Sequence, residues 1–266
     1  MKWTLEAEDA VKKVPFFVRK KVRSRIENEA AKAGKKAVSL ADVKATQARF
    51  LSNMSSEIKG YQLDTCFGEG GCPNRANSGE KMLERVERFL KQEDLLGFLK
   101  QRVQGDLKFH HEFRITIADC PNACSQPQIK DIGIIGASLP VSTDEACTSC
   151  EACVDECREN AITLQKEKSQ PKIDYDLCLA CGKCIEACPT GTIVADKKGF
   201  KVQLGGKLGR HPQLAKELPG IYSEDEVLNI VKNCIILYKS NSKQGVRFAE
   251  VFTLEDFKKF SGRYDS

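Results

Sequence analysis

Thirteen cysteines stand out in this chain of 266 residues, because twelve of them fall into short, patterned groups. Two groups share one spacing, with two residues between the first three cysteines and three residues before the fourth: Cys147, Cys150, Cys153 and Cys157, then Cys178, Cys181, Cys184 and Cys188. Thiolates this close in sequence suit one metal centre and make poor partners for ordinary long-loop disulfides. Three thiolates at this spacing wrap one corner of an iron–sulfur cubane, and the fourth ligand comes from the other group.

The two groups therefore predict two low-potential [4Fe-4S] clusters of the bacterial ferredoxin kind. One cluster is expected on the first cysteine set, which is Cys147, Cys150, Cys153 and Cys188. The other is expected on the second cysteine set, which is Cys178, Cys181, Cys184 and Cys157. The first motif ends in Arg158, where the second has Pro189, so its local turn is less fixed. Paired structural zinc sites are the alternative, but zinc ribbons join two CxxC units across a longer gap.

A third cysteine set lies outside this repeat and comprises Cys66, Cys72, Cys120 and Cys124. By spacing alone these residues could serve zinc or one more cluster. The stretch from Cys66 to Cys72 is rich in glycine, which lets the backbone approach a cofactor closely.

The sequence around this third set is more informative than its spacing. The runs CFGEGGCPNRANSGE and ADCPNACSQPQIKDIGIIG resemble the sulfite and nitrite reductase family, in its sirohaem and [4Fe-4S] domain. The resemblance implies a [4Fe-4S] cluster on Cys66, Cys72, Cys120 and Cys124, with Cys124 also bridging to the sirohaem iron. Cluster and haem would then form one electronic unit.

A glycine-rich loop, GGKLGRHP at residues 205–212, also resembles that family. Because sirohaem carries eight carboxylates, Lys207 and Arg210 are candidate anchors for them, and a plain surface turn is the alternative. The resemblance covers residues 60–140 and 200–265, with the ferredoxin repeat inserted between them. Small anaerobic and dissimilatory-type sulfite reductases share this arrangement.

Two features depart from the family pattern. A ferredoxin-like half-domain usually precedes the first cysteines, but residues 3–50 instead resemble the small helical domain of a light-independent protochlorophyllide reductase subunit, through VPFFVRKKVRSRIE. The strand before Cys120 usually carries several cations that bind sulfite oxygens. Here Arg114 could face an anion, whereas Glu112 would repel one. His111 is a candidate proton donor, although a hydrogen-bonded structural role is commoner for histidine.

The predicted fold class is α+β in three pieces. A helical domain is expected at 1–55, a sulfite-reductase-like domain at 56–144 and 198–266, and a ferredoxin domain at 145–197. Helices are expected from Pro15, from a Ser39–Asp42 capping box to Leu51, over 78–104, from the N-cap Ser223 and near Thr253. Strands are expected at 111–118, 131–136 and 161–164, and a short helix is expected after each cysteine motif. Cys234 lies in an apolar stretch and is expected to be buried.

Composition restricts the remaining possibilities. The net charge of +5 is spread along the chain without a dense basic tract, which favours a solvated surface over nucleic-acid binding. No apolar run is long enough to span a bilayer, and the first residues do not form a signal peptide, so we expect a cytoplasmic protein. Cysteines used as cluster ligands indicate a reducing, anaerobic setting.

Two functions follow as hypotheses. In the first, the chain is a small sirohaem sulfite or nitrite reductase: electrons pass from the ferredoxin clusters to the third set and across Cys124 to the haem. Anion and protons would be handled by Arg114, Lys207, Arg210 and His111. In the second, the chain is an electron-transfer subunit with three [4Fe-4S] clusters and no substrate reduction of its own. Both require a redox partner protein, and a homo- or hetero-oligomer could complete the pocket.

Overall fold

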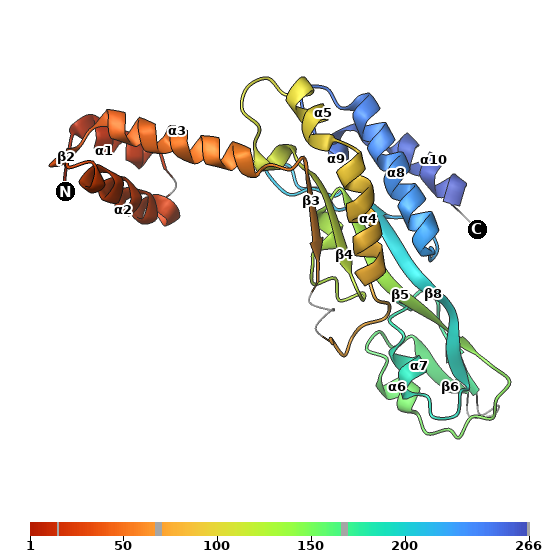
Figure 1. Ribbon diagram of the computed structural model, residues 1–266. Helices are drawn as coiled ribbons and strands as arrows, with labels where there is room; N and C mark the ends of the chain where they lie inside the picture. Colours follow the sequence, from red (N-terminus) through yellow and green to blue (C-terminus); the bar gives the residue numbers. More distant parts are fainter. Residues whose placement is uncertain (15, 67–70, 166–169, 265–266) are drawn as a thin grey trace. The chain divides into compact units, whose positions relative to one another are not determined.

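The computed structural model describes residues 1–14, 16–66, 71–165 and 170–264, and the chain forms two units (Figure 1). The first unit comprises Met1–Ile58 and Gly105–Phe109, and the second comprises Lys59–Gln104 and His110–Ser266. Both helices and strands are present, as the predicted α+β class requires. None of the helices in the described ranges is both long and apolar enough to cross a membrane.

The first unit is a small helical bundle. Its helices are α1 (Leu5–Lys12), α2 (Phe16–Lys32) and α3 (Leu40–Glu57), and the short strands β1 (Lys2–Trp3) and β2 (Ala37–Val38) pair in parallel. Six buried apolar side chains form its core: Ala7, Val11, Ile26, Ala30, Val38 and Val43. The predicted capping box is confirmed, because Ser39 and Asp42 cap α3 reciprocally. This helix continues to Glu57, six residues beyond the predicted end. The prediction for Pro15 lies outside the described residues.

A five-stranded sheet organises the second unit, in the order β3-β4-β5-β8-β9. Its strands are β3 (Tyr61–Thr65), β4 (Phe113–Ala118), β5 (Ile132–Ser142), β8 (Ile193–Leu204) and β9 (Lys216–Glu217). The first three strands are parallel, whereas β8 runs antiparallel to β5 and β9 antiparallel to β8. The predicted strands at 111–118 and 131–136 are therefore present, although β4 begins two residues later and β5 extends to Ser142.

Helices cover one face of this sheet (Figure 1). They are α4 (Glu80–Gln92), α5 (Leu95–Arg102), α8 (Glu224–Asn241), α9 (Phe248–Val251) and α10 (Leu254–Tyr264). Phe113, Ile115 and Ile117 point from β4 into the core beneath these helices, as their alternation predicts. Cys234 is fully buried in the same core, as expected. Ser223 caps α8 in a capping box with Glu226, which confirms the predicted start of this helix.

The helical segment predicted over residues 78–104 is present as two helices, with a break between them that the sequence analysis did not predict. The chain turns at Asp94, whose φ of 41° lies in the left-handed region. The Asp94 carboxylate then accepts a hydrogen bond from the Gly97 N–H and so caps α5. An aspartate that caps a new turn has a stronger local preference than the helical periodicity around it.

Residues 143–192 sit at the end of the long antiparallel pair formed by β5 and β8. They contain a hairpin of β6 (Ile162–Gln165) and β7 (Gln170–Ile173), and two short helices, α6 (Ala152–Asp155) and α7 (Lys183–Ala187). These helices lie within the cysteine motifs and carry Cys153 and Cys184, whereas we predicted them after the motifs. A short helix inside the motif turns successive thiols toward one point.

Candidate iron–sulfur centres

The first cysteine set gathers around one cavity, which Cys147, Cys150, Cys153 and Cys188 all line. Cys153 is buried on α6, while Cys150 is exposed. Burial raises the pKa of the Cys153 thiol, and the neighbouring Cys188, Cys147 and Cys150 raise it further. Burial acts in the same direction on Cys188, but the Ile193 N–H and the Thr190 hydroxyl bond its sulfur and lower its pKa to about 7. Four thiols from two distant motifs therefore face one another.

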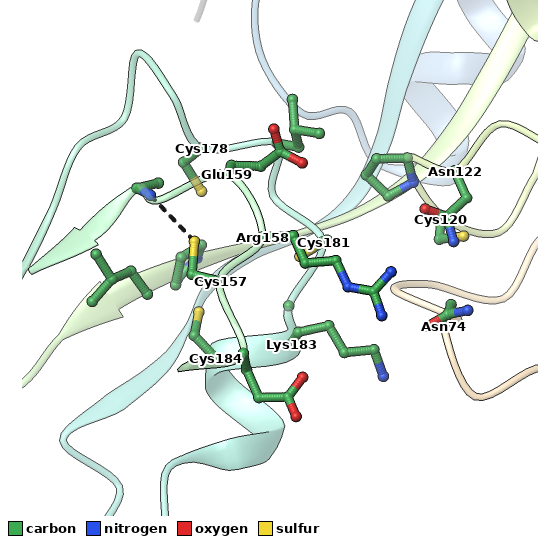
Figure 2. Close-up of a pocket in the computed structure, with 17 residues that line it drawn as sticks. Asn74, Cys120, Asn122, Cys157, Arg158, Glu159, Cys178, Cys181, Lys183 and Cys184 are labelled. Carbon is green, nitrogen blue, oxygen red and sulfur yellow. Dashed lines mark hydrogen bonds between the residues drawn. The ribbon is translucent and has the colours of Figure 1, made fainter. Parts of the chain in front are cut away.

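The second cysteine set lines a larger cavity of about 220 Å³. Figure 2 shows Cys157 entering this cavity from the first motif, beside Cys178, Cys181 and Cys184 of the second motif. Burial raises the pKa of Cys184 to about 12, and Cys181, Cys178 and Cys157 contribute to this rise. The same cavity extends to Cys120 of the third set, which lies on its far side.

Both motifs turn in the same way, which explains how one spacing produces two similar sites. Ser149 and Ala180 occupy equivalent positions, two residues after the first cysteine of each motif, and both have φ of 57°. Their N–H groups donate to the sulfurs of Cys147 and Cys178 respectively, each at 3.4 Å. An N–H pointed at a thiolate stabilises its negative charge. The backbone thus holds the thiols in a form suited to a metal cluster.

The third cysteine set is positioned by two neighbouring parallel strands. Cys66 follows β3 and Cys120 follows β4 by two residues, so the same edge of the sheet carries both. The Cys66 N–H donates to the Ile117 carbonyl at 3.0 Å, so the hydrogen bonding between β3 and β4 extends to Cys66. Burial raises the pKa of the Cys120 thiol, and Cys72, Cys124 and Cys66 add to the effect. Residues 67–70 of the glycine-rich stretch lie outside the described part of the chain.

Cys124 differs from the other members of the third set, because it is exposed whereas Cys120 is buried. It lies on the segment that returns over β4, where the next residue, Ser125, donates from its hydroxyl to the Ile117 carbonyl at 2.9 Å. An exposed thiolate next to three less exposed ones can contact a second group outside the cluster. This position fits the bridging role that the family resemblance implies for Cys124.

Asp119 organises the third set, and the sequence analysis missed it. This buried residue donates its N–H to the Cys66 sulfur at 3.3 Å, while its carbonyl accepts from the Ala76 and Asn77 N–H groups. Its carboxylate accepts from the Gly79 N–H at 3.0 Å and lies 3.0 Å from Arg75. The only sequence signal is an acidic residue at the end of an apolar strand, directly before a cysteine.

The thiols of the first and second sets each line a cavity. Within the described ranges, no group of three or more His, Cys, Asp or Glu side chains is close enough to hold a single metal ion. A cubane is larger than one ion and is held at its corners, so four thiols around a cavity fit a cluster better than they fit zinc.

The glycine-rich loop forms a small hairpin against the segment after Cys124. Lys207 and Gln213 exchange backbone hydrogen bonds, each 2.9 Å long. A β-carbon on Gly206 would lie 2.6 Å from the Gln128 carbonyl oxygen, so only glycine fits this approach. Arg210 and His211 are exposed. Lys207 is only 13% exposed and pairs with Glu250 at 2.8 Å, so a carboxylate ligand would compete with Glu250.

The remaining predicted site residues lie where β4 begins, at the end of the strand opposite Cys120. Arg114 is the second residue of β4, and His111 belongs to a short 3-10 helix ahead of it. Arg114 and Cys120 are thus about 20 Å apart along the chain. Glu112 is buried, and its carboxylate accepts from the Lys59 N–H and from Gln62, each at 2.8 Å. Its role is to tie β4 to β3.

Comparison with known protein families agrees with this architecture. Residues 62–261 match the model of the nitrite and sulphite reductase 4Fe-4S domain, and residues 3–47 match that of the proto-chlorophyllide reductase 57 kD subunit. The first match spans most of the chain, so the protein belongs to the nitrite and sulphite reductase 4Fe-4S domain family. Both predicted resemblances are confirmed. The family itself implies at least one [4Fe-4S] cluster.

Some of the proteins to which the chain is similar are sulfite reductases. The chain is 36% identical over 152 residues to the coenzyme F420-dependent sulfite reductase of Methanocaldococcus jannaschii, covering 56% of this chain and 24% of that protein. It is 32% identical over 127 residues to a subunit of the anaerobic sulfite reductase of Salmonella typhimurium, covering 46% of this chain and 37% of that subunit. The crystal structure of dissimilatory sulfite reductase I shares the fold, with a TM-score of 0.52, 17% identity and coverage of 75% and 51%. The chain thus spans between a quarter and about half of these proteins.

Proposed function

We propose that this protein is an electron-transferring subunit of a sulfite or nitrite reductase that carries three [4Fe-4S] clusters and sirohaem. Electrons enter from a redox partner protein through the first and second cysteine sets, which form a ferredoxin domain inserted at residues 145–197. They then reach the third set. The observation that supports this proposal is the cavity lined by both the second set and Cys120, because thiols assigned to two different centres face the same space.

The ferredoxin part of the proposal rests on the equivalence of the two motifs. Each set combines three thiols from one motif with one from the other, which is the ligand exchange typical of two-cluster ferredoxins. The positive φ angles and N–H donors recur at equivalent positions, as an internal repeat requires.

The sirohaem part rests on Cys124 and on the cations around its segment. The exposed thiol of Cys124 would hold the haem iron, and Arg210, with Lys207 after exchange of its Glu250 partner, would bind the haem carboxylates. Sirohaem supplies an iron at which the anion is reduced. Arg114 and His111 lie at the other end of β4, about 20 Å along the chain from Cys120, so the anion-binding and proton-donating roles expected of them are not part of this proposal. The similarity to a subunit of the Salmonella typhimurium anaerobic sulfite reductase supports a redox partner protein, because a subunit acts together with other chains.

The ion pair between Lys207 and Glu250 favours a second candidate function. Because one of the proposed carboxylate anchors is already neutralised and 13% exposed, the chain could carry electrons through three clusters and leave reduction to a partner. The two functions share every cluster and differ only in sirohaem and in the response to the anion.

A visible spectrum and an iron assay of anaerobically purified protein separate these functions. Sirohaem predicts a tetrapyrrole spectrum above the broad iron–sulfur absorption, roughly 13 irons per chain, and a spectral change of the reduced protein on adding sulfite or nitrite. Cys124→Ser should perturb this spectrum more than Cys66→Ser, because only Cys124 would touch both centres. Roughly 12 irons with no response to either anion would support the electron carrier. Zinc as the dominant metal would refute both functions.

A further inference from the structure

One lysine connects the second cysteine set to the third. Lys183 lies between Cys181 and Cys184, and its ammonium group donates to the carbonyl oxygen of Pro73, the residue that follows Cys72. The same group pairs with Glu186 at 2.8 Å. Residues from two motifs that are 110 positions apart in sequence are therefore joined by a single side chain.

The ion pair with Glu186 does not by itself explain why the Lys183 side chain reaches Pro73. Glu186 is 61% exposed and lies three residues along the same helix, and ion pairs of this kind contribute little to stability. The contact with Pro73 instead reaches into a different part of the sheet domain. Lys183 itself is only 25% exposed, so its charge is less screened by solvent than that of a free surface lysine.

Arg158 brings a second cation to the same cavity. It occupies the position that holds proline in the other motif, Pro189, so the repeat replaces a turn-fixing residue by a charge at this one place. Figure 2 shows the side chains of Arg158 and Lys183 extending from the second cysteine set toward Asn74 and Cys120. Glu156 and Glu159 also line the cavity and offset part of this positive charge.

The backbone fixes the second motif on the same side. The Ser138 N–H on β5 donates to the Ala180 carbonyl at 2.7 Å, and Ser138 forms a parallel bridge with Cys181. Ser138 and Ala180 are both buried. The second motif is therefore joined to β5 by backbone contacts at Ser138 and to the segment after Cys72 by Lys183.

We propose that Lys183 is a positioning residue for electron transfer: it holds the segment after Cys72 against the second motif and raises the reduction potential of the cluster on the second set. This proposal rests on the proposed function. A cluster gains one negative charge when it accepts an electron from the first set, and the nearby, partly buried cation of Lys183 stabilises that charge. No proton or covalent bond changes at Lys183. Arg158 acts in the same direction, more weakly because it is exposed.

Redox titrations followed by electron paramagnetic resonance test the proposal on the full-length protein. At the wild-type midpoint of the second-set cluster, Lys183→Gln should lower the ratio of reduced to oxidised cluster at least threefold, and Arg158→Gln should lower it less. A tenfold change corresponds to about 59 mV for one electron. Lys183→Arg should retain the wild-type midpoint potential, because it keeps the positive charge. Lys172→Gln is the matched control, because Lys172 is exposed on β7 and does not line the cavity.

Hydrogen exchange at Ala76 and Asn77 provides the second readout, because their N–H groups bond to Asp119 beside the Pro73 contact. Faster exchange in Lys183→Gln together with the lower potential would support the proposal. Faster exchange at an unchanged potential would leave only a structural role and overturn it. Cys150→Ala should remove the cluster on the first set, so the paramagnetic resonance signal that disappears in this variant belongs to that cluster. If the wild-type protein lacks ferredoxin-type clusters altogether, the proposed function fails and this inference fails with it. If all three clusters are present but the potential of the second-set cluster is unchanged in Lys183→Gln, only this inference is refuted.

Discussion

Asp119 shows how one side chain can define a metal site that it does not ligate. Its backbone and carboxylate contact both halves of the third set, through Cys66 on one side and residues 75–79 on the other. The loop that carries Cys72 has no regular secondary structure over residues 71–79 to keep it in place. Its position near Cys120 therefore depends on this buried carboxylate.

We expect Asp119→Ala to lower the iron content by about the share of one cluster and to destabilise the protein by about 1–3 kcal/mol, because the Gly79 N–H loses its acceptor. Asp119→Asn is the matched control, since its amide oxygen can still accept from Gly79 while the charge opposite Arg75 is lost. Iron assays and denaturant unfolding check both variants. An Asp119→Ala protein with full iron content would contradict the assigned role.

Asp131 is another buried carboxylate of the second unit, and its role concerns stability. It precedes β5, accepts from the Arg114 N–H at 2.8 Å and lies 3.8 Å from Arg247, near the buried Cys234 and Tyr238. Burial raises its pKa to about 6, although Arg247 and the N–H groups of Arg114 and Ala249 act in the opposite direction. The folded protein therefore binds a proton at Asp131 more tightly than the unfolded chain does.

A raised pKa makes the contribution of Asp131 to stability largest below about pH 4, and this contribution is lost as the pH rises to about 6. The loss is on the order of 3 kcal/mol. Asp131→Asn should remove this part of the pH dependence, so the unfolding free energy of the wild type should fall more steeply between pH 4 and 6 than that of the variant. Denaturant titrations of both proteins at each pH provide the measurement. Parallel pH profiles would show that Asp131 is already ionised at pH 4.

At the scale of elements, β5 and β8 carry residues 143–192, for which we propose the role of a ferredoxin insert. They remain paired from Ile132 and Leu204 to Ser142 and Ile193, and the Thr143 N–H still bonds to the Thr192 carbonyl at 2.8 Å. The part of these strands nearest the helices supplies core residues beneath them, namely Ile132, Ile134, Phe200, Val202 and Leu204. A smaller apolar cluster, which includes Ile162 and Ile193, stabilises the insert itself.

Replacing residues 144–191 with Asn-Gly should therefore leave the sheet intact, because this dipeptide forms the tight turn that antiparallel strands prefer. We expect the variant to lose roughly eight irons per chain and to keep the third cluster. Circular dichroism and iron analysis provide the measurement, and the full-length protein is the reference. Loss of all iron from a folded variant would show that the third set depends on the insert.

At the scale of the whole molecule, the two units have separate cores. The core of the sheet domain comprises residues between Met82 and Phe260, whereas the helical unit is built around Ala7, Ile26 and Val38. The first cysteine of the chain is Cys66, so residues 1–58 supply no thiol ligand. The match of residues 3–47 to a protochlorophyllide reductase subunit thus describes a module of its own.

Deleting residues 1–58 should leave the iron content per chain unchanged and the far-ultraviolet spectrum of the sheet domain intact. The physical reason is that neither ligands nor core residues of the second unit are removed. Iron assays and thermal unfolding of the shortened protein check this, with the full-length chain as control. A proportional drop in iron from a folded deletion variant would mean that the helical unit supports a cluster.

The sequence by itself determined the features that depend on local spacing. The cysteine motifs, the Ser39–Asp42 capping box, the N-cap Ser223 and the alternation of Phe113, Ile115 and Ile117 follow from residue types at fixed intervals, because helices and strands repeat with known periods. Both family resemblances rest on such short runs. The break at Asp94 was missed because a capping carboxylate competes with periodicity over a few residues.

Tertiary structure decided everything that depends on contacts between distant segments. Only the folded chain brings Lys183 to Pro73, Asp119 to the loop before α4 and Lys207 to Glu250. It also reversed the meaning of Glu112, which repels an anion when regarded as an isolated charge but is buried and hydrogen-bonded to β3. A sequence lists charges, but burial and the partner across the sheet determine whether each charge faces a ligand or holds two strands together.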